Sequence, residues 1–166
     1  MVEGSAIVHA NRNGEGLVKV IFPLNESDWG ALRTETMWAK PLGKSLYRLD
    51  NIPFYVYGIS AEDVISTISD QNSIFFSQVE ERGGHSTFRI LLNENIRHDA
   101  SVFKRRWPIF RDLGCSYEVA GPTWIAIDVP SNSDINRVKN LLEEGEHEGI
   151  WEWFDGYVAG SVGNTM

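Results

Sequence analysis

The stretch from Val79 to Leu92 reads Val-Glu-Glu-Arg-Gly-Gly-His-Ser-Thr-Phe-Arg-Ile-Leu-Leu and separates two parts of the chain that differ in pattern. Before it, short runs of apolar and β-branched residues alternate with turn residues, a pattern typical of strands joined by tight turns. After it, two amphipathic helical patterns alternate with strands. The sequence therefore predicts an α+β fold: a curved N-terminal β-sheet or partial barrel followed by a ferredoxin-like βαββαβ half.

The first part of the chain predicts a small, strongly curved sheet of five or six strands. Its apolar runs are short, and turn-forming glycine, proline, asparagine or aspartate residues separate them. Pro53 lacks a backbone N–H, so it interrupts strand pairing at that point. The expected strands cover residues 17–22, 33–41, 45–49, 54–58, 64–68 and 73–81.

The second part predicts the order strand, helix, strand, strand, helix, strand. In the first helix, Phe103, Trp107 and Phe110 recur at helical spacing on one face. Glycine residues follow both helical patterns and are natural C-terminal stops. The candidate capping residues, whose side-chain oxygens can accept from the first free N–H groups, are Asp99 or Ser101 and Ser131 or Ser133.

These patterns divide the chain into four segments. We expect a flexible leader over 1–16, because that stretch is polar and glycine-rich. A β-rich subdomain is expected over 17–85 and the βαββαβ subdomain over 86–158. Residues 159–166 are expected to be a flexible tail.

The composition is that of an ordinary folded protein, with 42% hydrophobic and 23% charged residues. No window approaches the roughly 18 consecutive apolar residues that a membrane span requires, and the first residues contain no apolar run of signal-peptide length. We therefore expect a cytoplasmic protein. Cys115 is the single cysteine, which excludes an internal disulfide and a thiolate metal cluster.

The negative charge is concentrated near the carboxyl end. The net charge is −8, and residues 140–166 contain six acidic residues but no lysine or arginine. Acidic groups repel phosphates, so this end disfavours nucleic acid and favours a basic protein partner. Tryptophans among these acids suit recognition of a basic surface, although a merely solvated acidic surface remains an alternative. The candidate partner-binding residues are Glu143, Glu144, Glu146, Glu148, Trp151, Trp153 and Asp155.

A second candidate site lies where the two halves meet. Arginine offers a planar fork of hydrogen-bond donors, so these residues could hold an anion such as a phosphate or carboxylate. Alternatively, a buried ion pair between Asp50 and Arg89 would tie the halves together. The residues of this candidate anion or inter-half site are Asp50, Arg82, His85 and Arg89.

The remaining motifs favour a non-enzymatic protein. His85 and Ser86 are adjacent on an expected strand and point to opposite faces, so the histidine cannot easily activate the serine. His9, His98 and His147 are too scattered to form a metal site with His85. No glycine-rich nucleotide-binding motif occurs. We therefore expect no catalytic residues, no metal and no cofactor; the oligomeric state stays open.

Several short motifs together resemble one bacterial family. They are Trp38-Ala39, Leu49-Asp50-Asn51-Ile52-Pro53-Phe54, Gly84-His85-Ser86-Thr87-x-Arg89, Leu113-Gly114, Val129-Pro130 and Gly149-x-Trp151-Glu152. In these elements the chain resembles DUF4265, a domain of unknown function, over roughly residues 17–154. The resemblance implies a coherent bacterial domain and brings no catalytic residues with it.

The sequence thus favours a protein-binding module, such as an immunity or regulatory protein that masks a basic partner through its acidic C-terminal surface. The alternative is a small-molecule or anion-binding protein, or an enzyme, with a pocket between the two halves.

Overall fold

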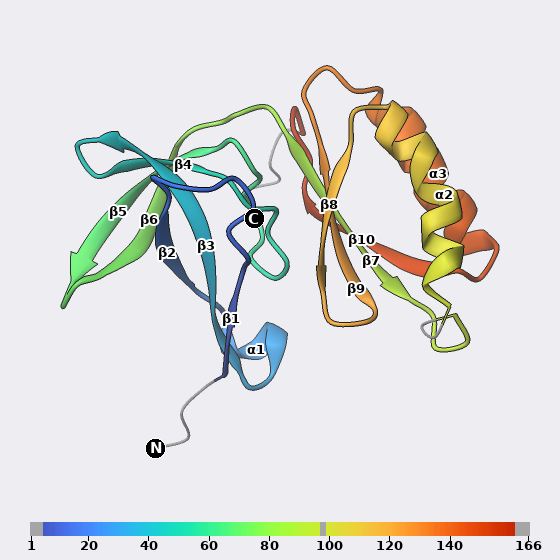
Figure 1. Cartoon of the computed structure of the whole chain (residues 1–166), viewed down its shortest axis with the longest axis horizontal. Helices are drawn as coiled ribbons and strands as arrows, with labels where there is room; N and C mark the ends of the chain where they lie inside the picture. The colour runs from blue at the N-terminus through green and yellow to red at the C-terminus, as the bar shows by residue number, and fades with distance from the viewer. Residues whose placement is uncertain (1–4, 97–98, 162–166) are drawn as a thin grey trace.

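The structure is a computed structural model that describes residues 5–96 and 99–161. Two β-sheets lie side by side, and two helices cover the outer face of the second sheet (Figure 1). Strands predominate, and the fold is mixed α+β, as the sequence predicted. Within the described ranges, no helix combines the length and the apolar content needed to cross a bilayer.

Five strands of the first sheet close into a barrel. In the order β3-β2-β6-β5-β4 each strand pairs with the next, and β4 also pairs with β3. Inward-pointing apolar residues such as Phe22, Met37 and Ile65 fill its interior. The short helix α1 (Glu26–Trp29) connects β2 to β3. The barrel strands are β2 (Val18–Pro23), β3 (Leu32–Gly43), β4 (Leu46–Leu49), β5 (Val64–Asp70) and β6 (Ser73–Glu81).

The N-terminal segment contributes a strand to this sheet. β1 (Ser5–Val8) pairs with β3 in parallel, and the backbone N–H of His9 continues the pairing by donating to Thr36. The prediction that residues 1–16 form a flexible leader is therefore wrong for residues 5–8, which form a strand. Apolar Ala6, Ile7 and Val8 give it strand character that the polar residues around them obscured.

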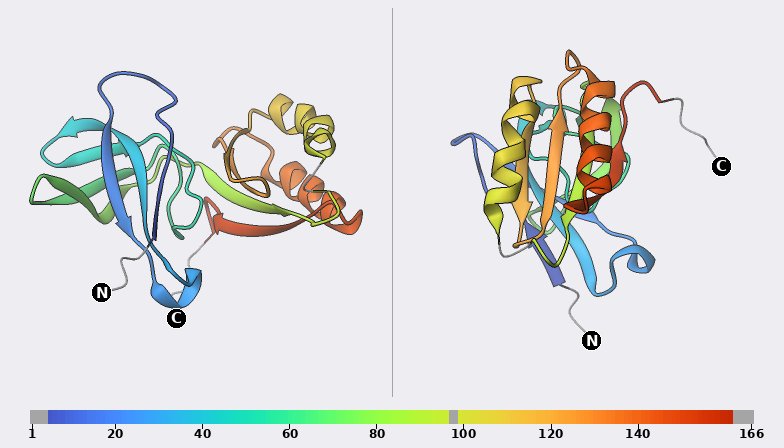
Figure 2. Two further views of the ribbon diagram at one scale, coloured as in Figure 1. Left: turned by 60° about the horizontal axis from the view of Figure 1, so that its bottom comes forward. Right: turned by 90° about the vertical axis from the view of Figure 1, so that its right-hand side faces the viewer.

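The second sheet has the strand order β10-β7-β9-β8, with every neighbouring pair antiparallel. Helix α2 (Ala100–Asp112) connects β7 to β8, and α3 (Ile135–His147) connects β9 to β10. Both helices pack on the sheet face that points away from the barrel (Figures 1 and 2). The strands are β7 (Ser86–Leu92), β8 (Ser116–Ala120), β9 (Trp124–Val129) and β10 (Trp151–Tyr157).

Aspartates cap both of these helices. The side chain of Asp99 accepts from the backbone N–H of Ser101, which confirms one of the two predicted caps of α2. For α3 the prediction of Ser131 or Ser133 is wrong, because Asp134 accepts from the N–H of Arg137.

The loop between β4 and β5 fills the space between the two sheets. Asn51, Ile52 and Phe54 are buried in it, and Phe54 packs on Ala126 of β9. The strand expected over 54–58 is absent from this described segment. Its N–H groups instead bond to a buried carboxylate, which removes the need for a strand partner.

Candidate functional site

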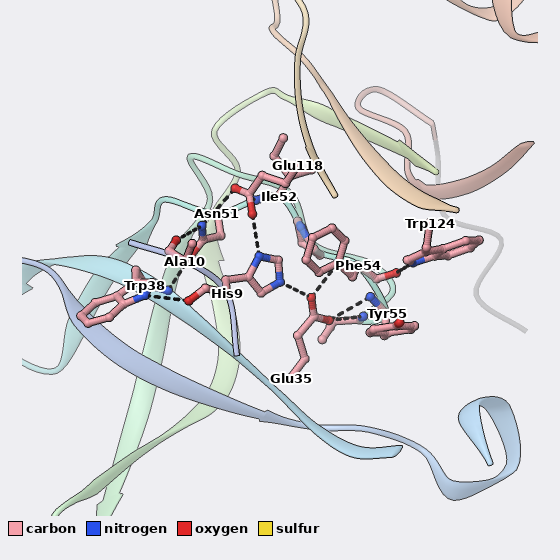
Figure 3. Close-up of polar contacts among 12 residues, drawn as sticks. His9, Ala10, Glu35, Trp38, Asn51, Ile52, Phe54, Tyr55, Glu118 and Trp124 are labelled. Carbon is pink, nitrogen blue, oxygen red and sulfur yellow. Dashed lines mark hydrogen bonds and ion pairs between the residues drawn. The ribbon is translucent and has the colours of Figure 1, made fainter. Parts of the chain in front are cut away.

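His9 is the centre of a buried polar network between the two sheets (Figure 3). Its Nε2 lies 2.6 Å from Oε1 of Glu35 on β3, and its Nδ1 lies 2.6 Å from Oε2 of Glu118 on β8. An ionised carboxylate can only accept, so both contacts are satisfied by an imidazolium that donates from each nitrogen. Burial opposes this charge, but the hydrogen bonds to Glu118 and Glu35 outweigh burial and raise the pKa of His9 above its ordinary value.

Glu35 anchors the loop that separates the sheets. Its side chain is fully buried on β3, and its carboxylate accepts from the backbone N–H groups of Phe54, Tyr55 and Val56 at 2.6, 2.9 and 2.9 Å. Three charge-assisted hydrogen bonds compensate the cost of burying this carboxylate. The Phe54 ring then stacks on the His9 imidazole, with the ring centroids 4.2 Å apart.

Glu118 binds the same loop from the opposite side. Its Oε1 accepts from the side chain of Asn51, the N–H of Ile52 and the guanidinium of Arg12, at 3.0, 3.1 and 2.9 Å. Burial by itself would raise the pKa of Glu118, but the hydrogen bonds from His9 and Asn51 hold it below its usual range. The network therefore joins the barrel, the loop and the second sheet.

A cleft of about 590 Å³ opens beside this network. One side is formed by residues 7–10, at the end of β1 and just beyond it, and the other by residues 117–121 of β8 and its turn. Arg12 and Phe54 also line the cleft. Charged groups of the network thus meet apolar side chains in a concave site between the two halves, a common setting for a binding site.

Arg89 holds the loop from β7, but its partner is not Asp50. Its Nε donates to the carbonyl of Pro53 at 3.2 Å and its Nη2 to that of Val56, and its guanidinium carbon lies 4.8 Å from the centroid of the Tyr57 ring. Burial lowers the pKa of Arg89, with Glu35 acting in the opposite direction.

The carboxylate of Asp50 accepts instead from the amide of Asn13, with both distances 2.9 Å. The predicted ion pair between Asp50 and Arg89 is corrected accordingly. Backbone carbonyls satisfy two of the arginine donors, whereas Nη1 has no hydrogen-bond partner within the described residues.

Arg82 and His85 do lie together, in a hollow of about 340 Å³ that Arg48 and Glu62 also line. Both are engaged by carboxylates: Arg82 donates to Asp63 at 3.0 Å, and Nδ1 of His85 donates to Asp128 at 2.9 Å. The bond to Asp128 raises the pKa of His85. The structure therefore brings Arg82 and His85 into one hollow, whereas Asp50 and Arg89 have other partners.

The acidic C-terminal residues lie on and after α3. Glu143, Glu144 and Glu146 line a hollow of about 680 Å³ on this helix, while Asp155 is exposed on β10. Two of the acids are paired: Glu144 accepts from Arg137 at 3.2 Å, and Glu148 accepts from Arg106.

Trp151 is a core residue, which corrects its predicted role as an exposed anchor. It is 1% exposed, and its indole N–H donates to the carbonyl of Leu142 at 2.9 Å. Trp153 is partly buried and packs edge-on against Phe88, with the ring centroids 5.8 Å apart. An apolar indole on this strand gains more by covering the sheet than by facing water.

No group of three or more histidine, cysteine, aspartate or glutamate side chains in the described part of the chain is arranged to hold a metal ion. His98 lies outside the described residues. Cys115 is buried, and burial raises the pKa of its thiol to about 12. A thiol with such a pKa is a poor nucleophile.

Comparison with known proteins identifies the family. The model of the domain of unknown function DUF4265 matches residues 35–153, and the chain belongs to this family. The fold also resembles the crystal structure of a hypothetical protein from Neisseria gonorrhoeae, with a TM-score of 0.73, 13% identity and coverage of 92% of this chain and 100% of that chain. No curated protein matches the chain.

Sequence reasoning missed the three central residues of the network. The expected leader includes His9, Glu35 lies between Thr34 and Thr36 in a polar stretch, and Glu118 alternates with Tyr117 and Val119 as a solvent-facing strand residue does. The available signal was the Asp50-Asn51-Ile52-Pro53 turn. Its free backbone donors require acceptors once the turn is buried.

Proposed function

We propose that this protein is a non-enzymatic binding protein whose ligand occupies the cleft between the barrel and the second sheet. The observation that carries this proposal is that His9, Arg12 and Glu118 all line one cleft of about 590 Å³. Loop hydrogen bonds hold Glu118 in place before any ligand arrives, and carboxylates hold His9 and Arg12. A preorganised lining of this kind lowers the entropic cost of binding.

Binding is favoured over catalysis because the charged groups are already engaged. A general base needs a free nitrogen or oxygen within reach of a substrate proton. Both ring nitrogens of His9 contact carboxylates, and Glu118 is bonded to Asn51, Ile52 and Arg12 as well. The network therefore serves to shape and stiffen the site.

The acidic face of α3 is a second candidate site, for a basic protein partner. Its support is the hollow bounded by Glu143, Glu144 and Glu146. The burial of Trp151 removes its expected aromatic anchor, and pairing with Arg137 neutralises part of its charge. An immunity or regulatory role in a bacterial cytoplasm would use either surface, and these assignments stay predictions.

We also infer a ferredoxin-like arrangement for the second half. The strand order β10-β7-β9-β8 and the placement of α2 and α3 between successive strands support this assignment.

A ligand screen with two matched variants tests the proposed function. Val119→Trp fills the cleft from an exposed position, and Glu143→Lys reverses a charge on α3. A compound or peptide that raises the melting temperature of the wild type is expected to lose this effect in Val119→Trp and to keep it in Glu143→Lys. The reverse pattern would move the site to α3, and a failure of every probe would reject the cleft.

A further inference from the structure

We propose that the cleft binds an extended peptide segment of a partner protein, which lies as an additional strand between β1 and β8. This inference rests on the proposed function, since it names the class of ligand that the same cleft accepts. Strand addition is a general mode of peptide recognition in which backbone hydrogen bonds supply affinity and alternate side chains supply specificity.

The lining of the cleft indicates that its two sides are strand edges. A sheet face presents alternate residues of a strand, because successive side chains point to opposite faces. Here the lining consists of consecutive residues on both sides, 7–10 and 117–121. Consecutive residues line a cavity together when the edge of the strand, with its N–H and C=O groups, faces it.

Both strands are the last members of their sheets. Within the described residues, β1 pairs only with β3, and β8 pairs only with β9. Proteins usually protect such edges with lysine, proline or a short bulged strand. β1, Ser-Ala-Ile-Val, is short and its register shifts between Ser5 and Ala6, so it has part of this protection, but neither β1 nor β8, Ser-Tyr-Glu-Val-Ala, contains lysine or proline. Each instead carries an exposed valine, Val8 at 54% and Val119 at 56%.

The two edges face each other without pairing. The link between them is the contact of His9 with Glu118, a bridge of two side chains rather than a backbone hydrogen bond. Neighbouring strands lie about 4.8 Å apart, so a strand inserted between β1 and β8 needs this spacing on each of its sides. Two side chains that meet end to end, as those of His9 and Glu118 do, can span a gap of this kind.

The charges of the cleft favour a backbone ligand over an ionic small molecule. His9 and Arg12 are matched by the carboxylates of Glu35 and Glu118. No ionised group of this network is left without a counter-charge, so an ionic ligand would gain little. Apolar Ile7, Val8, Tyr117 and Val119 suit apolar side chains at alternate positions of a peptide.

The test uses random ten-residue peptides displayed on phage and selected on the intact protein. Enriched peptides are expected to alternate apolar and polar residues. Synthetic copies are expected to slow amide hydrogen exchange of residues 5–10 and 116–120. Replacing their alternate N–H groups by N-methyl groups is expected to weaken binding at least tenfold in either of the two registers, since one set of N–H groups faces β1 and the other faces β8.

Two variants and a matched control complete the test. Val8→Lys and Val119→Lys each place a charge on the exposed position of one edge, and each is expected to lower the affinity for the synthetic peptides at least tenfold. Ile68→Lys, at an exposed barrel position outside the cleft, is expected to leave binding unchanged.

The outcomes separate this inference from the proposed function. If no peptide is enriched, but a small molecule binds the wild type and fails to bind Val119→Trp, the strand proposal fails and the cleft proposal survives. If peptides bind without protecting either edge, strand addition is rejected. If neither class of ligand binds, both proposals fail.

Discussion

His9 determines how the stability of the fold responds to pH. Its pKa is raised in the folded protein, above the unfolded value of about 6.5. The charged ring therefore stabilises the fold fully below about pH 6.5, and this contribution is lost as the pH rises through the folded pKa. For Glu118 the folded pKa is lowered, so its contribution is present above the unfolded value of about 4.3 and is lost as the pH falls through the folded pKa.

We therefore predict that the free energy of unfolding is greatest between about pH 4.5 and 6.5, bounded by the unfolded pKa values of the glutamate and histidine. Urea unfolding from pH 4 to 9 should show a decline above pH 6.5 that is smaller in His9→Gln. His85→Gln is the control. The pKa of His85 is also raised, so this variant should remove only the contribution of His85 to the decline in the free energy of unfolding. If imidazole NMR places the His9 titration below that of free histidine, the account of this network is wrong.

Arg89 supplies a second prediction at this scale. Its Nε and Nη2 reach two carbonyls, those of Pro53 and Val56, which a lysine ammonium cannot match in the same geometry. Arg89→Lys should lower the free energy of unfolding by about 1–3 kcal/mol, measured in urea. Arg48→Lys, on an exposed side chain, should change it by less than about 0.5 kcal/mol. Equal effects of the two variants would show that the carbonyl contacts do not stabilise the loop.

At the scale of elements, α3 depends on a glycine that helix propensity alone would disfavour. Gly145 is buried, and a Cβ there would lie 2.1 Å from Cζ2 of Trp151. Replacing a helical glycine by alanine normally stabilises a helix by about 0.5–1 kcal/mol. Here Gly145→Ala should instead destabilise the protein by about 1–3 kcal/mol through overpacking.

Thermal unfolding followed by tryptophan fluorescence measures this effect, with Glu143→Ala on the exposed face as the control. A stabilising Gly145→Ala would mean that the indole of Trp151 is not packed against the helix. It would also restore this side chain as a candidate for the exposed anchor on the acidic surface.

The elements of the second half could be predicted because their signals are local. Phe103, Trp107 and Phe110 mark one helix face, and alternating strands flank both helices. The strand status of β1 could not be predicted in the same way, because four residues carry little periodicity. It depends on pairing with β3, whose partner residues, such as Leu32 for Ser5 and Thr36 for Val8, come much later in the chain.

At the scale of the whole molecule, the curved sheet was predictable but its closure was not. Closure needs β2 to pair in parallel with β6 and β4 to pair with both β3 and β5, contacts that no short sequence window contains. The same limit applies to the site. Glu35 shares the inward face of β3 with Met37, and both Glu35 and Glu118 find hydrogen-bond partners in the distant loop that contains Asn51 and Phe54.

The central claim is that ligands bind between the two halves, and NMR can test it most directly. Amide spectra of the isotope-labelled protein would be recorded during titration with the first compound or peptide that raises its melting temperature. The account predicts shifts concentrated in residues 7–12 and 117–121, at the cleft between β1 and β8. Shifts confined to α3 around Glu143 and Glu146, with the cleft unchanged, would contradict it.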